Sequence, residues 1–416
     1  MPAPTLSIKL DLSNGATFDP ALILDSPETP LDYSVLGTAA SEVVDITSLV
    51  TQLYIRRAFN RSADSFTGGN AKLVFVDSSG NFNPSNTSSP YYGKIKPMRK
   101  IKFTATYLGT IYNLGSFYVQ QWDYQSPTGF DPAYVTLNCV DGFQLLNLTT
   151  ITTVTGGSAG QTTAQRISSL LDAGDWPGGM RDISSTATTT VQADDGSSRS
   201  LLAACQTLET TELGAFYIDQ RGYTKFMSRA DIITAAGGTV TAFSDDPADA
   251  AITYQQAQFD ISDYQMINKC TVTRTGGTAQ TSTDSQSILD YFEHSRIRTG
   301  IMQSDTDALN QAQMIIASRK EEGVNLSLNS LTVDAYGSVD PSRVTAALNL
   351  DIFDPIRVTQ YFPNGDVVSD TVISGVTYQI TPKSFLVTFT CAQPFASALL
   401  LNSSIDGLLD NDTLGY

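Results

Sequence analysis

The sequence predicts a mainly β fold with an α+β insertion, and three observations support this. Only 16% of the 416 residues are charged, while Thr, Ser, Tyr and Val, which favour strands, are abundant. Short runs of alternating polar and apolar residues recur, separated by Gly, Pro and Asn. Helical spacing of apolar residues is confined mainly to the middle of the chain and to one later stretch. Strands this short and regularly spaced indicate two antiparallel β-barrel or sandwich domains.

Residues 1–145 are predicted to form the first β domain. Leu6–Leu12 alternates polar and apolar residues and stops at Asn14-Gly15, a dipeptide typical of hairpin turns. The same reasoning predicts further strands over Val50–Ala58, Asn70–Val76, Lys100–Tyr107, Thr110–Trp122 and Tyr134–Val140.

Residues 146–258 are predicted to form a small α+β unit. Thr163–Asp172 and Ser200–Leu213 carry apolar residues at helical spacing, and Gly214 is a plausible stop for the second helix. Ala215–Asp219 and Tyr223–Met227 then read as the two strands of a hairpin. The unit is therefore two helices followed by a hairpin.

Residues 259–400 are predicted to form the second β domain. A helix capped by Ser304 or Asp305 interrupts it near residues 304–322. The expected strands are Met266–Arg274, Val324–Val333, Arg343–Leu350, Ile356–Gln360, Thr371–Ile380 and Phe385–Cys391. Residues 401–416 read as an acidic, loop-like tail.

The composition argues against several classes of function. The chain has 25 Lys and Arg residues against 42 Asp and Glu, a net charge of −17, which is the opposite of the balance in phosphate-neutralising nucleic-acid binders. No apolar run reaches the roughly 18 residues of a membrane span, and the first residues lack the pattern of a signal peptide. A single histidine leaves little material for histidine chemistry.

The four cysteines are far apart in the sequence: Cys139, Cys205, Cys270 and Cys391. No CxxC pair occurs, which argues against zinc-ribbon and thioredoxin-like motifs. Free cysteine is among the most buried residue types. We therefore expect four buried thiols in a reducing compartment.

One segment matches the GxSxG pattern of a nucleophile elbow. Gly156-Gly-Ser158-Ala-Gly160 follows a strand-like run, Leu145–Val154, and precedes a predicted helix. The base would have to be His294, oriented by Asp172 or Asp219. A Gly/Ser linker between two domains explains the same residues, and without the matching fold this reading is favoured.

Pairs of carboxylates are the remaining candidates for ligand binding. Asp194-Asp195, Asp245-Asp246 and Asp410 with Asp412 could present oxygen ligands to a hard cation, but none matches an EF-hand loop. Walker A and GxGxxG patterns are absent from the sequence. We therefore predict solvated loop acids and assign no catalytic, cofactor-binding or metal residues.

Charge is distributed unevenly near the N-terminus. Residues 51–110 contain nine Lys and Arg residues against Asp64 and Asp77, whereas residues 1–50 contain seven acids against Lys9. Opposed patches can drive head-to-tail or ring association between copies. A solvated strand face explains the same distribution.

A connected series of motifs resembles the tail hub proteins of long-tailed bacteriophages, often called minor tail proteins. The series in the first domain is Phe66-Thr-Gly-Gly69, Asn70–Val76, Asp77-Ser-Ser-Gly80, Phe82-Asn-Pro84, Ser89-Pro90-Tyr91, Ile95-Lys-Pro97, Tyr107-Leu-Gly109 and Leu114–Trp122. Ser200–Arg229 resembles the helix-plus-hairpin domain of these hubs, and Phe353–Val358 with Val372–Gly375 resembles their late barrel. Asp77-Ser-Ser-Gly80 replaces the usual Asn-x-Asp-Gly, and Met98 stands where glycine often follows Pro97.

The resemblance implies a structural hub of the tail tip or baseplate with two domains shaped like tail-tube subunits. Three copies would give a pseudo-sixfold ring that continues the tube, with a channel through which DNA passes without specific binding. The implied partners are the distal tail or tail tube proteins, a tail fibre or tip protein and the tape measure protein. The implied location is the virion, after assembly in the host cytoplasm. The alternatives are a hexameric distal tail or tube protein and a receptor-engaging carbohydrate-binding or hydrolytic module.

Overall fold

The computed structural model of the chain describes most of its length. The described residues are 3–13, 42–60, 65–128, 131–246, 248–324, 326–337, 340–362 and 365–393. The expected turn at Asn14-Gly15 and the acidic tail 401–416 lie outside them.

The first third of the chain forms a β layer, called here the first lobe. Its strands are β1 (Thr5–Asp11), β2 (Val43–Asp45), β3 (Val50–Asn60), β4 (Ser65–Phe66), β5 (Asn70–Val76), β6 (Arg99–Tyr107), β7 (Thr110–Gln125) and β8 (Tyr134–Val140). β8 buries every second residue, as its alternating sequence predicts. The predicted strands of this region are confirmed.

The second lobe combines strands from two parts of the chain. They are β14 (Thr241–Ser244), β15 (Ile252–Thr253), β16 (Gln256–Asp260), β20 (Ser327–Asp334), β21 (Pro355–Gln360), β22 (Val367–Thr381) and β23 (Ser384–Ala392). Most neighbours are antiparallel, but β14 runs parallel to β15 and to β21.

The two lobes share one continuous sheet because β22 pairs with β3. The order of the 15-stranded sheet runs β15-β14-β21-β22-β3-β5-β8-β7-β6-β1-β2, an open path among the described residues, with β4, β16, β20 and β23 attached beside it. Gly375 of β22 lies opposite Ala58 of β3, where an added Cβ would come within 2.8 Å of the alanine side chain. This seam, the β3–β22 pairing, therefore needs a residue without a side chain.

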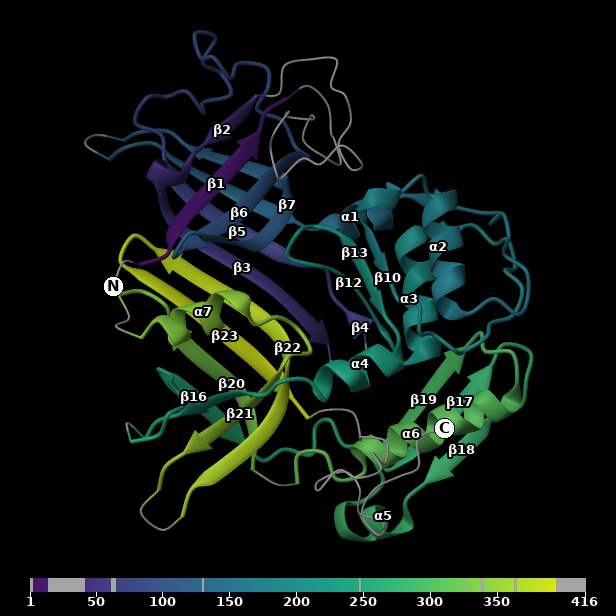
Figure 1. Ribbon diagram of the computed structural model, residues 1–416. Coiled ribbons are helices and arrows are strands. Elements are labelled where there is room, and N and C mark those ends of the chain that lie inside the picture. The colour runs from purple at the N-terminus through teal and green to yellow at the C-terminus, as the bar shows by residue number, and fades with distance from the viewer. Residues whose placement is uncertain are drawn as a thin grey trace.

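A helix-hairpin unit lies beside the lobes (Figure 1). It contains α1 (Gly142–Leu148), β9 (Thr150–Ile151), α2 (Thr163–Ala173), β10 (Arg181–Ile183), β11 (Arg199–Ser200), α3 (Leu201–Glu212), β12 (Ala215–Ile218), β13 (Thr224–Met227) and α4 (Arg229–Ala236). The predicted helices and the β12–β13 hairpin are confirmed, and Asp219 shapes the turn by accepting hydrogen bonds from the backbone N–H groups of Arg221 and Tyr223.

A second compact element, called here the outer unit, packs against the helix-hairpin unit and lies below it in Figure 1. It contains β17 (Lys269–Arg274), β18 (Gln280–Thr283), α5 (Ser285–Tyr291), β19 (Ser295–Gly300) and α6 (Asp305–Arg319), and α6 covers one face of the three-stranded sheet. Ser304 caps α6 by accepting from the N–H of Asp307. The predicted helix is confirmed, with Ser304 as its cap.

Two sequence-based assignments were wrong. Arg343–Leu350, expected as a strand, belongs to α7 (Pro341–Asn349), because Asp340 caps it, Pro341 starts it, and Val344, Ala347 and Leu348 share one buried face. The strand-like run Leu145–Val154 begins instead with the end of α1, which Asp141 caps by accepting from the N–H of Phe143.

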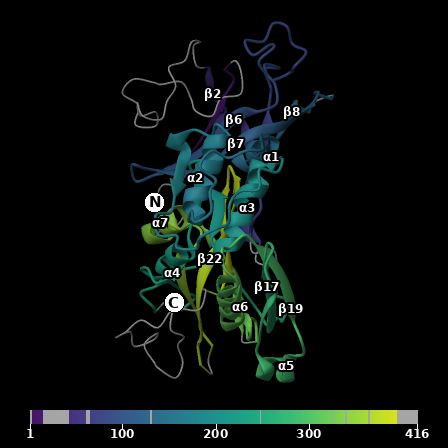
Figure 2. The same ribbon diagram turned by 90° about the vertical axis from the view of Figure 1, so that its right-hand side faces the viewer.

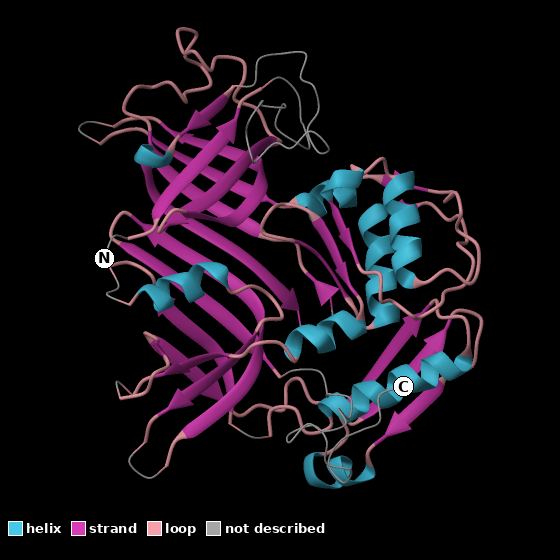
Figure 3. Cartoon of the chain, in the orientation of Figure 1, coloured by secondary structure: helices cyan, strands magenta, loops and turns pink. Residues whose placement is uncertain are grey.

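The overall architecture is elongated, with the first lobe at one end and the second lobe and outer unit at the other (Figure 2). Strands dominate, and most helices lie in the helix-hairpin and outer units (Figure 3). The mainly β class with an α+β insertion is confirmed. The domain boundaries at residues 145 and 258 remain predictions. No helix in the described ranges is long and apolar enough to cross a bilayer.

Candidate functional site

The GxSxG segment folds around a buried arginine. Arg166 of α2 is 1% exposed, and its guanidinium donates to the carbonyl oxygens of Ser158 and Gln192 at 2.8 and 2.9 Å and to the Gln161 side chain. Its remaining nitrogen lies 3.7 Å from the carboxylate of Asp194. Arg166 therefore connects the loop that contains Ser158 with the loop that contains Asp194.

The other members of the hypothetical triad lie elsewhere. The Ser158 loop is joined through Thr190 to Gln303, which follows the far end of β19. His294 precedes the opposite end of that six-residue strand, which spans about 20 Å. The strand therefore separates His294 from the end that the Ser158 loop contacts. The His294 ring contacts the carbonyl of Tyr291 and the carboxylate of Asp263.

The two candidate acids are also engaged without histidine. Asp172 pairs with Arg181 at 2.5 Å, and Asp219 pairs with Arg221 at 2.7 Å. The described geometry therefore does not assemble the nucleophile, base and acid that the motif requires.

Replacing Ser158 by alanine is accordingly expected to have little effect. The side chain is exposed, so the free energy of unfolding should change by less than about 0.5 kcal/mol. Neither the parent chain nor Ser158→Ala should hydrolyse short acyl esters in a colorimetric assay. Hydrolysis by the parent that the substitution abolishes would restore the triad hypothesis.

The paired carboxylates serve internal contacts. Asp194 pairs with Arg199 and Arg166, and Asp245 accepts from the backbone N–H of Tyr361 at 2.7 Å. Asp410 and Asp412 lie outside the described residues. Across the described ranges, no group of three or more His, Cys, Asp and Glu side chains is placed to hold a metal ion.

The burial of the cysteines agrees with the sequence analysis. All four are buried and free. Burial raises the pKa of the Cys139 and Cys391 thiols to about 12, which makes their nucleophilic thiolate forms rare near neutral pH.

The charge asymmetry near the N-terminus is partly compensated within the chain. Lys94 forms an ion pair with Glu42, and Lys9 faces Asp45 across β1 and β2. At Lys94, therefore, an acid of residues 1–50 neutralises a cation of the same lobe. Asp19, Asp25, Glu28 and Asp32 of the same segment lie outside the described residues, and association through opposed patches stays a prediction.

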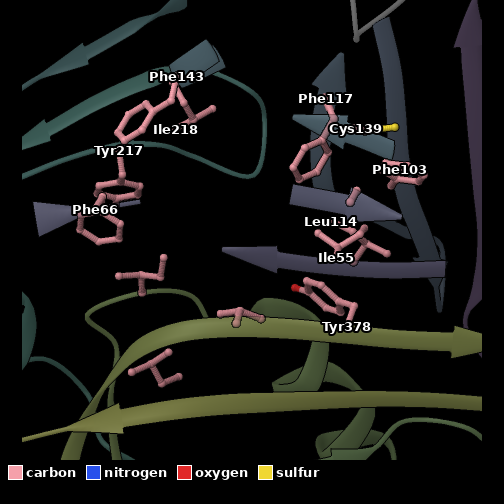
Figure 4. Close-up of a cluster of buried hydrophobic side chains, with 14 of the residues drawn as sticks. Ile55, Phe66, Phe103, Leu114, Phe117, Cys139, Phe143, Tyr217, Ile218 and Tyr378 are labelled. Carbon is pink, nitrogen blue, oxygen red and sulfur yellow. The ribbon is translucent and has the colours of Figure 1, made fainter. Parts of the chain in front are cut away.

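Buried aromatic and polar contacts are concentrated at a junction where three parts of the chain meet. Phe66 of β4 stacks on Tyr217 of β12, with ring centroids 4.6 Å apart, and its edge meets Phe353, which precedes β21. Figure 4 shows Phe66 and Tyr217 in contact, within the core that continues to Ile55 and Tyr378 across the seam. We call Arg57, Phe66, Asp141, Glu209, Tyr217, Asp351 and Phe353 the three-way junction.

Glu209 of α3 ties the helix-hairpin unit to the first lobe. This side chain is fully buried, and its Oε1 accepts hydrogen bonds from the backbone N–H groups of Phe66 and Phe216 at 3.2 and 3.0 Å. Gln206, one turn earlier, donates to the carbonyl of Phe66. Both backbone polar groups of Phe66 are thus satisfied by α3.

Arg57 of β3 ties the first lobe to the second. Its guanidinium is 4% exposed and lies 2.7 Å from the carboxylate of Asp351. Burial alone would lower the pKa of Arg57, but Asp351 more than offsets this and leaves it raised. The pair therefore crosses the seam, with a buried guanidinium and a carboxylate whose side chain is 22% exposed.

Asp141 joins β8 to the start of α1 at the same place. Its carboxylate accepts from the backbone N–H groups of Gly69 and Phe143. Burial raises the pKa of Asp141 to about 7, although these hydrogen bonds and nearby Arg57 act in the opposite direction. The folded protein therefore binds this proton more tightly than the unfolded chain, whose aspartate pKa is about 4.

This shift predicts a pH dependence of stability. Because the folded state holds more protons between about pH 4 and pH 7, the stability falls as the pH rises through that window. We expect a higher melting temperature at pH 5 than at pH 8, and a smaller difference in Asp141→Asn. Circular dichroism melts of both proteins at the two pH values make the test, and an equal difference in both would contradict the assignment to Asp141.

Comparison with known proteins identifies the fold. Neither family models nor curated protein sequences match the chain. Among solved structures, a tail protein from Neisseria meningitidis MC58 matches with a TM-score of 0.57 at 9% identity, covering 94% of this chain and 97% of the other. The 43 kDa tail protein of prophage MuSo2 from Shewanella oneidensis matches with a TM-score of 0.54 at 15% identity and the same coverage. The chain has the fold of phage tail proteins.

This result confirms the resemblance at the level of the fold, over nearly the whole chain. Sequence reasoning did not foresee the three-way junction. Glu209 lies within the motif Ser200–Arg229. Its position on a predicted helix did not indicate that its carboxylate would accept hydrogen bonds from residues of two strands. Arg57 likewise gave no sign of its partner 294 positions away.

Proposed function

We propose that the chain is a structural component of a phage tail, a homotrimeric hub at the tail tip. The observation that carries this proposal is the pairing of β3 with β22, which joins the two β lobes in one continuous sheet. Three such chains supply six lobes, the number needed to meet a sixfold tail tube. The likeness to tail proteins over 94% of the chain supports it.

The proposed mechanism is mechanical. The hub continues or closes the tube, docks the neighbouring distal tail or tube proteins, a fibre or tip protein and the tape measure protein, and leaves a channel for DNA. A net charge of −17 suits passage without specific binding, since DNA is repelled by an acidic surface. The hub acts in the virion after assembly in the host cytoplasm.

A non-enzymatic role is part of the proposal. It is supported by the separation of Ser158 from His294 and by the engagement of Asp172 and Asp219 with arginines. The density of buried interactions at the three-way junction serves rigidity, which a load-transmitting hub requires.

Stoichiometry in the particle tests this proposal. Tails purified from cells that express the complete tail gene cluster are digested, and the chain is quantified by mass spectrometry against labelled peptide standards. Three copies per tail at the tip, located by immunogold labelling, are expected. Six copies would favour the hexameric distal tail or tube protein, and absence from the particles would overturn a tail role.

A further inference from the structure

Phe292, directly after α5, has a conformation that its side chain does not favour. Its φ of 66° and ψ of 174° lie in a region that is essentially restricted to glycine. Its side chain is nevertheless 86% exposed, so core packing does not explain why a phenylalanine occupies this position.

A buried network holds Phe292 in place. Asn268, fully buried, donates from Nδ2 to the Phe292 carbonyl at 2.7 Å and to the Ser287 hydroxyl, and its Oδ1 accepts from the N–H of His294 at 2.7 Å. Ser287 in turn donates to the carbonyl of Lys320 at the end of α6. The outer unit thus fixes the backbone on both sides of Phe292 and leaves the ring in solvent.

Two further exposed apolar side chains come from α5 and from the segment that contacts His294. Leu289, one turn earlier on α5, is 79% exposed. Tyr264 is 76% exposed and follows Asp263, which contacts His294 at 3.6 Å. We call Tyr264, Leu289 and Phe292 the tip patch. Both ribbon views place α5 at the end of the molecule remote from the first lobe (Figures 1 and 2).

The area and charge of the tip patch indicate what kind of surface could bind it. Three side chains of this size expose on the order of 500 Å², less than the roughly 800 Å² per partner in a stable dimer. The exposed acids Asp263, Asp290 and Glu293 are sequence neighbours of these three residues; Lys269 pairs with Glu293, and the His294 ring lies 3.6 Å from Asp263. A complementary surface is therefore an apolar pocket with a basic rim.

We propose that the tip patch is a docking site for a different protein of the same tail, which receives Phe292 in an apolar pocket rimmed by Lys or Arg. The inference rests on the proposed function. A ring closed through the β lobes leaves the outer unit beside them, where a second copy of this chain is not the nearest neighbour. An exposed aromatic anchor on a rigid backbone suits such a contact, because little conformational freedom is lost on binding.

Stability measurements test the strain at Phe292. Glycine adopts the observed conformation freely, so Phe292→Gly should raise the melting temperature by about 1–3 °C. Leu148→Gly replaces a 64% exposed residue at the end of α1 and should lower it, because glycine is unfavourable in a helix. A melting temperature lowered by Phe292→Gly would overturn the premise.

Photo-crosslinking in assembled tails tests the docking. A benzoylphenylalanine replaces Phe292 or, as the control, Leu148, and purified tails are irradiated and analysed by mass spectrometry. A crosslink from position 292, and not from 148, to a different tail polypeptide is expected. A crosslink to another copy of this chain, or none although the chain is in the particles, would overturn the inference and leave the proposed function standing. Absence of the chain from the particles would instead count against the proposed function.

Discussion

Replacing Arg57 by alanine is expected to lower the free energy of unfolding by about 2–3 kcal/mol, because the buried arginine loses its packing and its ion pair while the partly exposed Asp351 can still be solvated. The substitution leaves Asp351 without its partner, and it removes a side-chain ion pair between β3 and the segment before β21. Because the pair crosses the seam, the loss should weaken the attachment of one lobe to the other.

Arg56 provides the matched control for this experiment. It is the neighbouring residue on β3, has the same side chain and points to the opposite, exposed face. Arg56→Ala should change the free energy of unfolding by less than about 0.5 kcal/mol. Urea unfolding followed by circular dichroism compares the two variants. Equal decreases in the free energy of unfolding would show that the Arg57–Asp351 pair does not stabilise the fold more than an exposed arginine does.

Replacing Glu209 by alanine is expected to cost about 2–5 kcal/mol of unfolding free energy. The change leaves the buried backbone N–H groups of Phe66 and Phe216 without their acceptor, and each such group costs about 1–3 kcal/mol. Because these groups lie in different parts of the chain, the helix-hairpin unit should loosen from the first lobe.

Glutamine at the same position separates the hydrogen bonds from the charge. Both bonds use the single oxygen Oε1, so the amide oxygen of Glu209→Gln can accept them both, and the loss should stay below about 1 kcal/mol. Hydrogen exchange at Phe66 and Phe216 reports the two amides directly. Protection retained in Glu209→Ala, or lost equally in both variants, would contradict the proposed role of this oxygen.

Local pattern predicted the elements well where one face of the element is buried. Tyr134–Val140 alternates strictly and is a strand with the predicted bounds. The prediction failed for Arg343–Leu350, where β-favouring Val344 and Thr345 belong to a helix set by Asp340 and Pro341. Propensity was overridden there by the cap and by the shared face toward the core.

The contacts that make the fold one body could not be predicted from local pattern. The seam joins β3 to a strand more than 300 residues later, and alternation in either strand does not specify a partner. The burial of Arg166 was equally hidden, since its acceptors are mostly backbone carbonyls that follow from loop conformation. The ordered series of motifs indicated the fold, whereas no local pattern indicated the three-way junction.

The native mass of the purified full-length chain, with negative-stain imaging of the same sample, tests the hub proposal most directly. The account predicts a species of three subunits that forms a closed ring with a central opening. Six subunits would contradict the trimeric hub in favour of a distal tail or tube ring. A compact monomer that stays monomeric in the presence of isolated tail tubes would contradict the structural role itself.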